Sequence, residues 1–258
     1  MKVADKVVVV TGGASGIGRA LCKRFAKEGA KAVVVADMDE EGANAVAEEI
    51  QAMAVACDVS KEDDIIRMVR LTEKNIGPVD LFCSNAGILT MGGLEVSNEK
   101  WQSIWEINVM GHVYAARAVI PGMIERGGGS MLITASAAGL LSHVDSAPYS
   151  VTKHAAVGLA EHIAITYGDR GIKVFALCPQ AIHTKMIRSD AGVTGIDGMM
   201  EPEELADCVI EAFEKETFLI LPHPEVQTYM QKKASDYDRW IKGMRRLLKR
   251  FEGQDPGS

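Results

Sequence analysis

Short runs of β-branched residues alternate with helical patterns along most of the chain, and no other feature limits its fold as strongly. The first run, Val7–Val10, is apolar at every position, as expected for a strand buried on both faces of a parallel sheet. Similar runs predict strands at 32–36, 55–57, 80–84, 131–135, 173–178 and 218–221. Helical patterns between them imply right-handed crossovers. The sequence therefore predicts an α/β fold with one doubly wound, Rossmann-like parallel sheet of about seven strands.

The chain of 258 residues has the length of one domain, and its patterns divide it into three parts. Residues 1–224 are predicted to form the domain that contains the sheet, with a long helix at 101–125. Residues 225–252 are predicted to form an additional C-terminal amphipathic helix with a basic face. Its apolar stripe can be covered by its own domain, by a second copy or by an anionic membrane, and we favour the first two. Residues 253–258 are expected to be a tail.

Composition argues against several classes of function. The net charge of −7 does not favour general nucleic-acid binding. The longest apolar run near the N-terminus, Val7–Val10, is too short for a signal peptide or a membrane span, so we expect a cytoplasmic protein without a membrane partner. The five cysteines are widely spaced and the six histidines form no HxxxH pattern, and we therefore expect no metal site.

The segment Thr11–Gly18 (TGGASGIG) lies between the first predicted strand and a helix. Glycine permits a tight turn and lets backbone N–H groups approach a pyrophosphate at the start of the helix. The context of strand, turn and helix favours a dinucleotide site over a chance cluster of glycines. The residues expected to contact the dinucleotide here are Gly12, Ser15, Gly16, Ile17 and Gly18.

Asp37 ends the second predicted strand, 19 residues after Gly18. A carboxylate at this point can accept hydrogen bonds from both hydroxyls of the adenosine ribose and would repel a 2′-phosphate. Met38 follows it, and no Lys or Arg lies between residues 12 and 18. NAD is therefore predicted as the cofactor rather than NADP.

Tyr149 and Lys153 lie four residues apart in a predicted helix, so their side chains share one face. A nearby ammonium group stabilises phenolate and lowers the pKa of the tyrosine, which suits it to proton transfer. Ser136 lies 13 residues before Tyr149, at the end of the fifth predicted strand and at the same edge of the sheet. The same spacing recurs at Tyr229 and Lys233, but no strand end or glycine turn precedes that pair, and we assign it to a solvated helix face.

These motifs together resemble those of the short-chain dehydrogenase/reductase family, in its short single-domain branch, over residues 5–221. Further matches to the family pattern follow the third, fourth and sixth strands and lie in the helix at 101–125. They are Asp58, Asn85, Ala86, Gly87, Asn108, Pro179 and Thr184. The resemblance implies that residues 1–224 bind NAD and carry the catalytic groups.

The resemblance implies a catalytic set of four residues, with Tyr149 as general base in alcohol oxidation or general acid in carbonyl reduction. Lys153 would hold the nicotinamide ribose and lower the pKa of Tyr149. Ser136 would hydrogen-bond the substrate oxygen, and Asn108 would hold a water that links Lys153 to solvent. His143 lies between Ser136 and Tyr149 in the sequence and is either a pocket residue or an ordinary packed histidine.

The resemblance also implies cofactor contacts beyond the glycine turn. Asp58 and Val59 would flank the adenine, and Ile182 and Thr184 would fix the carboxamide of the nicotinamide. The remaining expected cofactor residues, besides the glycine turn and Asp37, are Met38, Asn85, Ala86, Gly87, Tyr149, Lys153 and Pro179.

The chain departs from the family pattern at three points. Ser84 replaces the first asparagine of the usual Asn-Asn-Ala-Gly, and Gln180 replaces the glycine that usually follows Pro179. The glutamine adds bulk beside the nicotinamide and can help to select the substrate. The usual glycine-rich C-terminal ending is absent, which leaves open whether the protein is a homodimer or a homotetramer.

The predicted function is that of an NAD-dependent oxidoreductase that interconverts a small-molecule secondary alcohol and a ketone by hydride transfer. Apolar residues near the catalytic edge favour a substrate with an apolar skeleton: Ile88, Leu89, Met91, Leu94, Leu140, Leu141, Val144 and Met186. Hydroxysteroids, hydroxy fatty acids, prostanoid-like alcohols and aromatic alcohols all stay open. The alternative is a non-catalytic NAD-binding regulatory or scaffold protein, which would not require Ser136, Tyr149 and Lys153 together.

Overall fold

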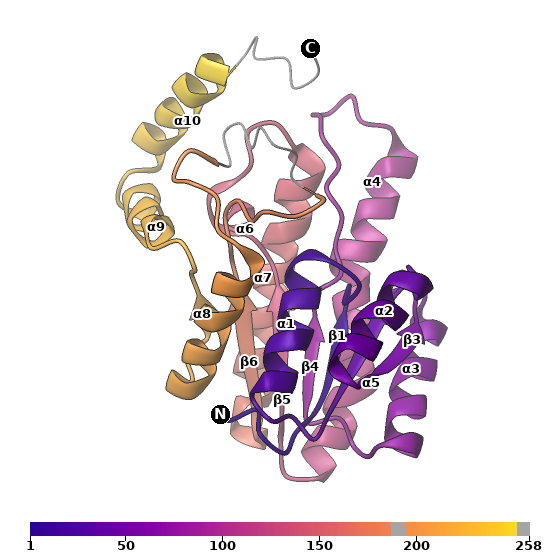
Figure 1. Ribbon diagram of the computed structural model, residues 1–258. Coiled ribbons are helices and arrows are strands. Elements are labelled where there is room, and N and C mark those ends of the chain that lie inside the picture. Colours follow the sequence, from indigo (N-terminus) through magenta and orange to yellow (C-terminus); the bar gives the residue numbers. More distant parts are fainter. Residues whose placement is uncertain (187–194, 252–258) are drawn as a thin grey trace.

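Seven parallel strands form one sheet in the computed structural model, which describes residues 1–186 and 195–251 (Figure 1). The strands are β1 (Val7–Thr11), β2 (Ala32–Asp37), β3 (Met53–Ala56), β4 (Leu81–Ser84), β5 (Gly129–Thr134), β6 (Ile172–Leu177) and β7 (Leu219–Ile220). Their order is β3-β2-β1-β4-β5-β6-β7, and every neighbouring pair is parallel. The predicted doubly wound α/β fold is thus confirmed.

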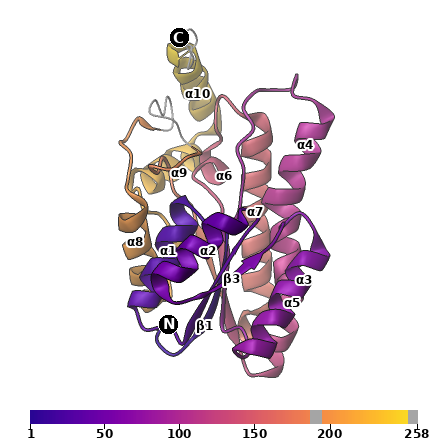
Figure 2. The same ribbon diagram turned by 45° about the vertical axis from the view of Figure 1, so that its right-hand side comes forward.

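β1 shows why these strands are apolar throughout. Val8 and Val10 belong to one hydrophobic core and Val9 to another, because successive side chains of a strand point to opposite faces of the sheet. One core lies under α1 (Gly16–Lys27), α2 (Glu40–Ile50) and α8 (Pro202–Lys215), and the other under α3 (Glu62–Asn75), α5 (Gly111–Glu125) and α7 (Ala147–Tyr167). Helices therefore cover the sheet on both faces (Figure 2).

The chain reverses its direction across the sheet between β1 and β4. It first runs outward through β2 and β3 and then crosses back, so that Val8 of β1 pairs with Leu81 of β4. The loops that follow β1 and β4 diverge at this point. In open parallel sheets, ligands bind in the crevice at the carboxyl ends of the strands where the order reverses. The predicted site residues follow these strand ends.

The helix predicted at 101–125 starts slightly earlier and contains a π-helical turn. α4 (Asn98–Trp105) leads into the π turn η1 (Glu106–Met110) and then into α5. Asn108 is the central residue of this turn, and π turns within helices are frequent at functional sites. A further short helix, α6 (Ala138–Leu141), follows β5 and was not predicted.

The C-terminal helical extension predicted over 225–252 is present, but two helices form it instead of one. α9 (Glu225–Ser235) ends at Asp236, whose backbone is extended with φ −156° and ψ 93°, and α10 (Tyr237–Phe251) follows. The Asp236 carboxylate accepts a hydrogen bond from the Arg239 N–H at 2.9 Å, so this one residue ends α9 and caps α10. α9 contacts α6, whereas α10 extends beyond the sheet domain (Figures 1 and 2). The predicted tail, 253–258, lies outside the described residues.

The described residues also bear on the expectations from composition. Within 1–186 and 195–251, none of the helices has the length and apolarity that crossing a bilayer requires. In the same residues, no three His, Cys, Asp or Glu side chains gather as ligands for a metal ion. Four of the five cysteines, all but Cys208, are buried.

Candidate active site

The turn after β1 is closely packed around its glycines. Gly12 and Gly16 have positive φ angles of 69° and 50°, which glycine adopts without strain. A Cβ atom on Gly18 would lie 2.0 Å from the carbonyl oxygen of Gly12, and one on Gly16 would lie 3.0 Å from Cγ2 of Thr184. Thr184 therefore lies against the start of α1, where the N–H groups of the first helical turn can bind a pyrophosphate.

Asp37 is fixed beside the same turn by two backbone groups. Its Oδ2 accepts a hydrogen bond from the Ala14 N–H at 3.0 Å, and its Oδ1 accepts one from the Asp39 N–H at 3.0 Å. The neighbouring Met38 side chain is 76% exposed. An ordered carboxylate and an exposed apolar side chain thus border the helix start, where the ribose of a bound dinucleotide is expected.

The other residues expected near the dinucleotide also lie at this edge. Ser15 precedes α1 in extended conformation, and Ile17 packs on the core under α1. Asp58 follows β3 and accepts hydrogen bonds from the N–H and the hydroxyl of Ser60 at 3.0 and 2.7 Å. Val59 is buried against Gly111, on which a Cβ atom would lie 3.2 Å from the Val59 carbonyl oxygen.

Asn85 joins the ends of three strands. Its N–H donates to Thr11 Oγ1 and its Nδ2 donates to the Thr11 carbonyl oxygen, both at 3.0 Å, while its Oδ1 accepts from Thr134 Oγ1 at 3.1 Å. The Ala86 N–H also donates to Thr11 Oγ1, at 3.1 Å. Thr11 ends β1 and Thr134 ends β5. Asn85 therefore fixes the carboxyl ends of β1, β4 and β5 relative to one another.

Asn108 is fully buried in the π turn, and its side-chain amide bonds to both backbone groups of Ile88. Its Oδ1 accepts from the Ile88 N–H at 2.8 Å, and its Nδ2 donates to the Ile88 carbonyl oxygen at 2.9 Å and to Thr152 Oγ1 at 3.3 Å. A Cβ atom on Gly87 would lie 3.2 Å from Asn108 Oδ1 and 3.4 Å from Lys153 Nζ. The absence of a side chain at Gly87 thus leaves room for both polar groups at one place.

Ser136 connects the end of β5 to the segment after β6. Its hydroxyl accepts from the Ala138 N–H at 3.1 Å and donates to the carbonyl oxygen of Pro179 at 3.4 Å. The same carbonyl oxygen accepts from the Ala137 N–H at 2.8 Å. Ser136 is only 8% exposed, so its hydroxyl is held in place at the carboxyl edge of the sheet.

Tyr149 lies in the first turn of α7, where the cap of the helix orients it. The Ser146 hydroxyl accepts from the Tyr149 N–H at 3.1 Å and donates to the Thr90 carbonyl oxygen at 2.6 Å. The His143 ring meets the Tyr149 ring edge-on, with centroids 6.2 Å apart and an interplanar angle of 85°. The structure therefore places His143 against the tyrosine rather than away from the site.

Lys153 lies one turn after Tyr149 and is 3% exposed. Its Nζ is 5.6 Å from the centroid of the Tyr149 ring and donates to the Thr134 carbonyl oxygen at 2.9 Å. Burial lowers the pKa of Lys153 to about 8.

The expectation that Lys153 lowers the pKa of Tyr149 is not met in the protein alone. Burial raises the pKa of Tyr149 above its ordinary value, because it removes water from the phenolate, and a hydrogen bond with Ser136 opposes this only in part. Lys153 directs its ammonium group to the Thr134 carbonyl oxygen. The two side chains share one helix face as predicted, but desolvation is the largest cause of the shift in the Tyr149 pKa.

Ser84, a departure from the family pattern, forms a buried pair that the sequence did not reveal. Its hydroxyl and the Nδ1 atom of His112 are 2.6 Å apart. Burial, with the charge of Lys153 as a second cause, lowers the pKa of His112 to about 3, so the imidazole is neutral. The Nε2 atom of His112 is buried and has no hydrogen-bond partner among the described residues.

Gln180, the second departure, turns its side chain toward the segment 195–200. Its Nε2 donates to Asp197 Oδ2 at 3.0 Å, and its N–H donates to Nδ1 of His223 at 3.2 Å. Ile182 is 2% exposed and pairs with Met200 in an isolated parallel bridge. The segment after β6 is thus held from both sides before it reaches Thr184.

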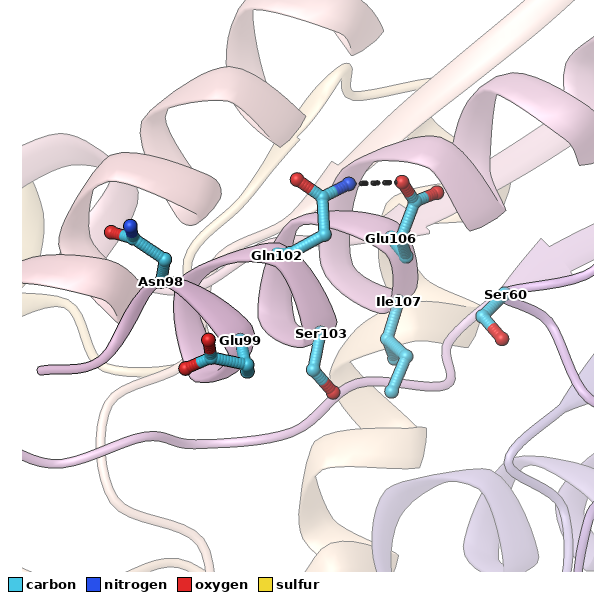
Figure 3. A pocket seen from close by; sticks show the side chains of 7 residues that line it. All are labelled: Ser60, Asn98, Glu99, Gln102, Ser103, Glu106 and Ile107. Atoms are coloured by element: carbon cyan, nitrogen blue, oxygen red, sulfur yellow. Dashed lines mark hydrogen bonds between the residues drawn. The ribbon is translucent and has the colours of Figure 1, made fainter.

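A further hollow of about 630 Å³ lies along α4 and includes Ser60, the hydrogen-bond donor to Asp58 (Figure 3). Six of its seven lining residues are polar, and Gln102 donates a hydrogen bond to Glu106 there. The lining residues are Ser60, Asn98, Glu99, Gln102, Ser103, Glu106 and Ile107. None of them is a predicted catalytic or cofactor residue, so we do not place the reaction in this hollow.

Comparison with known proteins agrees with the arrangement at the sheet edge. A family model described as short chain dehydrogenase matches residues 6–192. The chain belongs to the short-chain dehydrogenase family. It is therefore an oxidoreductase with the dinucleotide-binding fold of that family, as the sequence motifs predicted.

Two curated relatives of this short-chain dehydrogenase act on hydroxyl-bearing compounds by name. It is 32% identical to 1-deoxy-11-beta-hydroxypentalenate dehydrogenase of Streptomyces exfoliatus, over 93% of its own chain and 91% of the relative. It is 31% identical to 3beta-hydroxysteroid dehydrogenase 2 of Eggerthella lenta, over 79% and 86%. A short-chain dehydrogenase/reductase from Burkholderia phymatum, solved in complex with NAD, superimposes with a TM-score of 0.86 at 26% identity and covers 92% of this chain and 96% of that one.

Proposed function

We propose that this short-chain dehydrogenase uses NAD to interconvert a secondary alcohol and a ketone on an apolar skeleton. The observation that carries the proposal is the convergence of Ser136, Tyr149 and Lys153 at the carboxyl edge of the sheet, with Lys153 buried against the Thr134 carbonyl oxygen. A buried ammonium group is costly, and such groups are most often retained where they act in chemistry. A non-catalytic scaffold would have no use for this arrangement.

The residues around the glycine turn fit NAD. The crowded positions of Gly12, Gly16 and Gly18 leave the N–H groups at the start of α1 free to meet a pyrophosphate. The ordered Asp37 carboxylate suits an adenosine ribose with two free hydroxyls and disfavours a 2′-phosphate. The name of the Burkholderia phymatum structure, which contains NAD, supports the same choice.

The catalytic roles follow from the positions of four side chains. NAD, when bound, supplies the acceptor for a hydride. Tyr149 takes the proton of the substrate hydroxyl during oxidation and returns it during reduction, while the Ser136 hydroxyl donates a hydrogen bond to the substrate oxygen. Lys153 holds the ribose and stabilises the phenolate. Asn108 binds the Ile88 backbone close to Lys153, where a water can link the Lys153 ammonium group to solvent.

The substrate side of the site is apolar. Leu94 is 91% exposed and Met91 is 53% exposed near the catalytic edge, and Met186 is also exposed. Exposed apolar side chains around a site favour an apolar ligand. The two relatives are named for hydroxyl groups on a pentalenate and on a steroid, and this supports a ring-based secondary alcohol here.

The assembly is proposed to be a homodimer or homotetramer in which a second copy covers part of the C-terminal extension. Tyr237 and Ile241 of α10 are exposed at 58% and 50%, although the helix pattern places them on its apolar stripe. A folded chain rarely leaves such a stripe uncovered.

The proposal is tested by an absorbance assay at the reduced-nicotinamide band, with NAD or NADP and a panel of cyclic secondary alcohols. We expect turnover with NAD that exceeds turnover with NADP by at least about tenfold, because Asp37 repels the 2′-phosphate. Equal or greater turnover with NADP would contradict the cofactor choice. NAD binding by calorimetry without turnover of any alcohol or ketone would favour the non-catalytic alternative.

A further inference from the structure

The second Tyr-x-x-x-Lys pair, Tyr229 and Lys233 on α9, is expected from the sequence on a solvated face, but both side chains are half-buried and bonded to other segments. The Tyr229 hydroxyl donates a hydrogen bond to Asp197 Oδ1 at 2.9 Å. Lys233 Nζ donates to the Leu140 carbonyl oxygen at 2.6 Å. One turn of helix separates the two side chains, so a single face of α9 reaches two segments that are far apart in the sequence.

The Tyr229 contact continues to the residue beside the proposed catalytic serine. The other oxygen of Asp197, Oδ2, accepts a hydrogen bond from Gln180 Nε2 at 3.0 Å. Gln180 directly follows Pro179, whose carbonyl oxygen accepts a hydrogen bond from Ser136 Oγ at 3.4 Å. Glycine at position 180, the usual residue of the family pattern, has no side chain to reach Asp197. The connection from α9 to this segment therefore depends on the Gln180 departure.

The Lys233 contact reaches the same serine from the other side. Leu140 lies on α6, the short helix that begins two residues after Ser136. The Ala138 N–H of that helix donates to the Ser136 hydroxyl at 3.1 Å. Lys233 thus bonds to the helix whose Ala138 N–H donates to the Ser136 hydroxyl. Tyr229 acts on the other side: through Asp197 and Gln180 it restrains the segment whose carbonyl oxygen accepts the hydrogen bond from that hydroxyl.

Apolar packing keeps α9 in place between these two contacts. Val226 is fully buried in a small cluster with Ala137 and Leu141 of the α6 region, and Tyr229 and Met230 pack against this cluster. Both polar contacts therefore start from a helix whose position is fixed by burial of its apolar face. Each contact is made by a long side chain that a single substitution can shorten or neutralise.

We propose that Tyr229 and Lys233 form a two-point clamp that positions the two segments on either side of Ser136 and so determines which substrates fit. The two side chains are positioning residues, because they act on Ser136 only through Asp197 and Gln180 or through α6. The proposal rests on the proposed function for Ser136. It assigns the first part of the C-terminal extension to the wall of the active site.

The first test measures the clamp without any substrate. Hydrogen exchange with peptide resolution is compared among the wild type, Tyr229→Phe, Lys233→Met and Lys233→Arg. We expect Tyr229→Phe to speed exchange in residues 195–200 and Lys233→Met to speed it in residues 138–142, in each case by about five- to tenfold, since each loses one hydrogen bond that restrains the segment. Lys233→Arg should restore slow exchange in 138–142, because the guanidinium also donates to a carbonyl oxygen.

Two control variants change equivalent groups on α10. Tyr237→Phe removes an exposed hydroxyl but keeps the ring that lies 5.5 Å from Lys233 Nζ, and Lys242→Met removes the charge of an exposed lysine. Neither should alter exchange in 138–142 or 195–200. Unchanged exchange in both segments for Tyr229→Phe and Lys233→Met would overturn the clamp, as would equal changes in the α10 controls.

The second test measures substrate selection with NAD and two probes, cyclohexanol and a 3β-hydroxysteroid. We expect the Tyr229→Phe, Lys233→Met double variant to raise KM for the steroid by about five- to tenfold, to raise KM for cyclohexanol by less than twofold, and to keep kcat within about twofold. Equal effects on both probes, or a loss of kcat without a change in KM, would overturn the role in selection. If the wild type oxidises neither probe, the proposed function fails while the exchange measurement still decides whether the clamp exists.

Discussion

Two helices of this short-chain dehydrogenase carry the same Tyr-x-x-x-Lys spacing in opposite chemical surroundings. On α7, Tyr149 lies beside the Ser136 hydroxyl, which opposes the rise in its pKa, and Lys153 is buried with its pKa lowered to about 8. On α9, Tyr229 donates its proton to the Asp197 carboxylate, and Lys233 is half-buried and reaches a carbonyl oxygen.

The difference shows that the Tyr-x-x-x-Lys spacing only places the two side chains on one helix face, whereas the neighbouring groups determine whether the tyrosine can release its proton. The pKa of Tyr229 is raised first by burial and then by Asp197, because a neighbouring carboxylate holds the phenolic proton. Tyr229 is therefore a hydrogen-bond donor and not a base. Tyr149 has a hydroxyl group and a cation close by rather than a carboxylate, so the same phenol can give up its proton once the cost of burial is met.

The largest expected effect separates the two tyrosines by activity. Tyr149→Phe should lower kcat for cyclohexanol oxidation by about 10³-fold, because proton transfer in general acid–base catalysis contributes about 10² to 10⁴. Tyr229→Phe should lower it less than about twofold, because Tyr229 only positions segments beside Ser136. Both are measured as the rate of NAD reduction, with NAD binding by calorimetry as the check on folding. Similar losses for both variants would remove the distinction between the two pairs.

A smaller effect distinguishes the two lysines, because replacing each by methionine should change the stability of the folded protein differently. Burial lowers the pKa of Lys153 from 10.5 to about 8, which costs the folded protein on the order of 3 kcal/mol, and the bond to the Thr134 carbonyl oxygen returns about 1 kcal/mol. Lys153→Met should therefore stabilise the protein without cofactor by about 2 kcal/mol at pH 7 and raise Tm by about 4–8 °C. Lys233→Met should not raise Tm.

The stabilisation expected for Lys153→Met depends on pH, because the folded and unfolded pKa values of Lys153 differ. The folded pKa of Lys153 lies below the unfolded value, so the cost of burying the cation is complete below pH 8 and disappears as the pH rises to 10.5. The difference in Tm between Lys153→Met and the wild type should therefore shrink between pH 8 and pH 10. A Lys153→Met protein that is less stable at pH 7 would contradict the interpretation.

The smallest expected effect contrasts a buried histidine on α5, His112, with an exposed histidine on α7, His162. His112 has a folded pKa of about 3 against 6.5 in the unfolded chain, so its contribution to stability is complete above pH 6.5 and is lost as the pH falls. Between pH 6.5 and pH 5 this amounts to roughly 1–2 kcal/mol. Thermal unfolding at both pH values should show a smaller acid loss for His112→Gln than for the wild type, whereas His162→Gln, on the exposed face of α7, should match the wild type.

The sequence predicted the strands and the site residues at strand ends, because both leave direct signs. A run such as Val7–Val10 can be satisfied only by burial on both faces, and the glycines of the turn after it mark positions where a Cβ atom does not fit. The two polar side chains on one face of α7 follow from helical spacing. The family assignment made from these signs is confirmed.

Contacts made through backbone groups and through distant side chains could not be predicted. The Thr134 carbonyl oxygen that holds Lys153 belongs to no motif, since every residue has such a group. The break at Asp236 was missed because one capping residue inside a continuous amphipathic pattern changes the helix but not the periodicity. The Tyr229 pair is assigned to a solvated face from the sequence because no strand end or glycine turn precedes it. Its partner Asp197 lies 32 residues away in a segment without periodic pattern, so no sequence signal indicates the contact.

The insertion of β4 between β1 and β5 also has a consequence for a growing chain. Val8 must meet Leu81, and the Val7 N–H must meet the Asp80 carboxylate 73 residues later, before the crevice beside the glycine turn has two walls. Joining positions so distant in the sequence is slow, because the entropy of closing the loop is lost before the contact is gained. A ribosome-bound fragment that ends before β4 therefore presents the phosphate-binding turn without the surface opposite it, and the second wall of the crevice can form only after β2 and β3 have been synthesised.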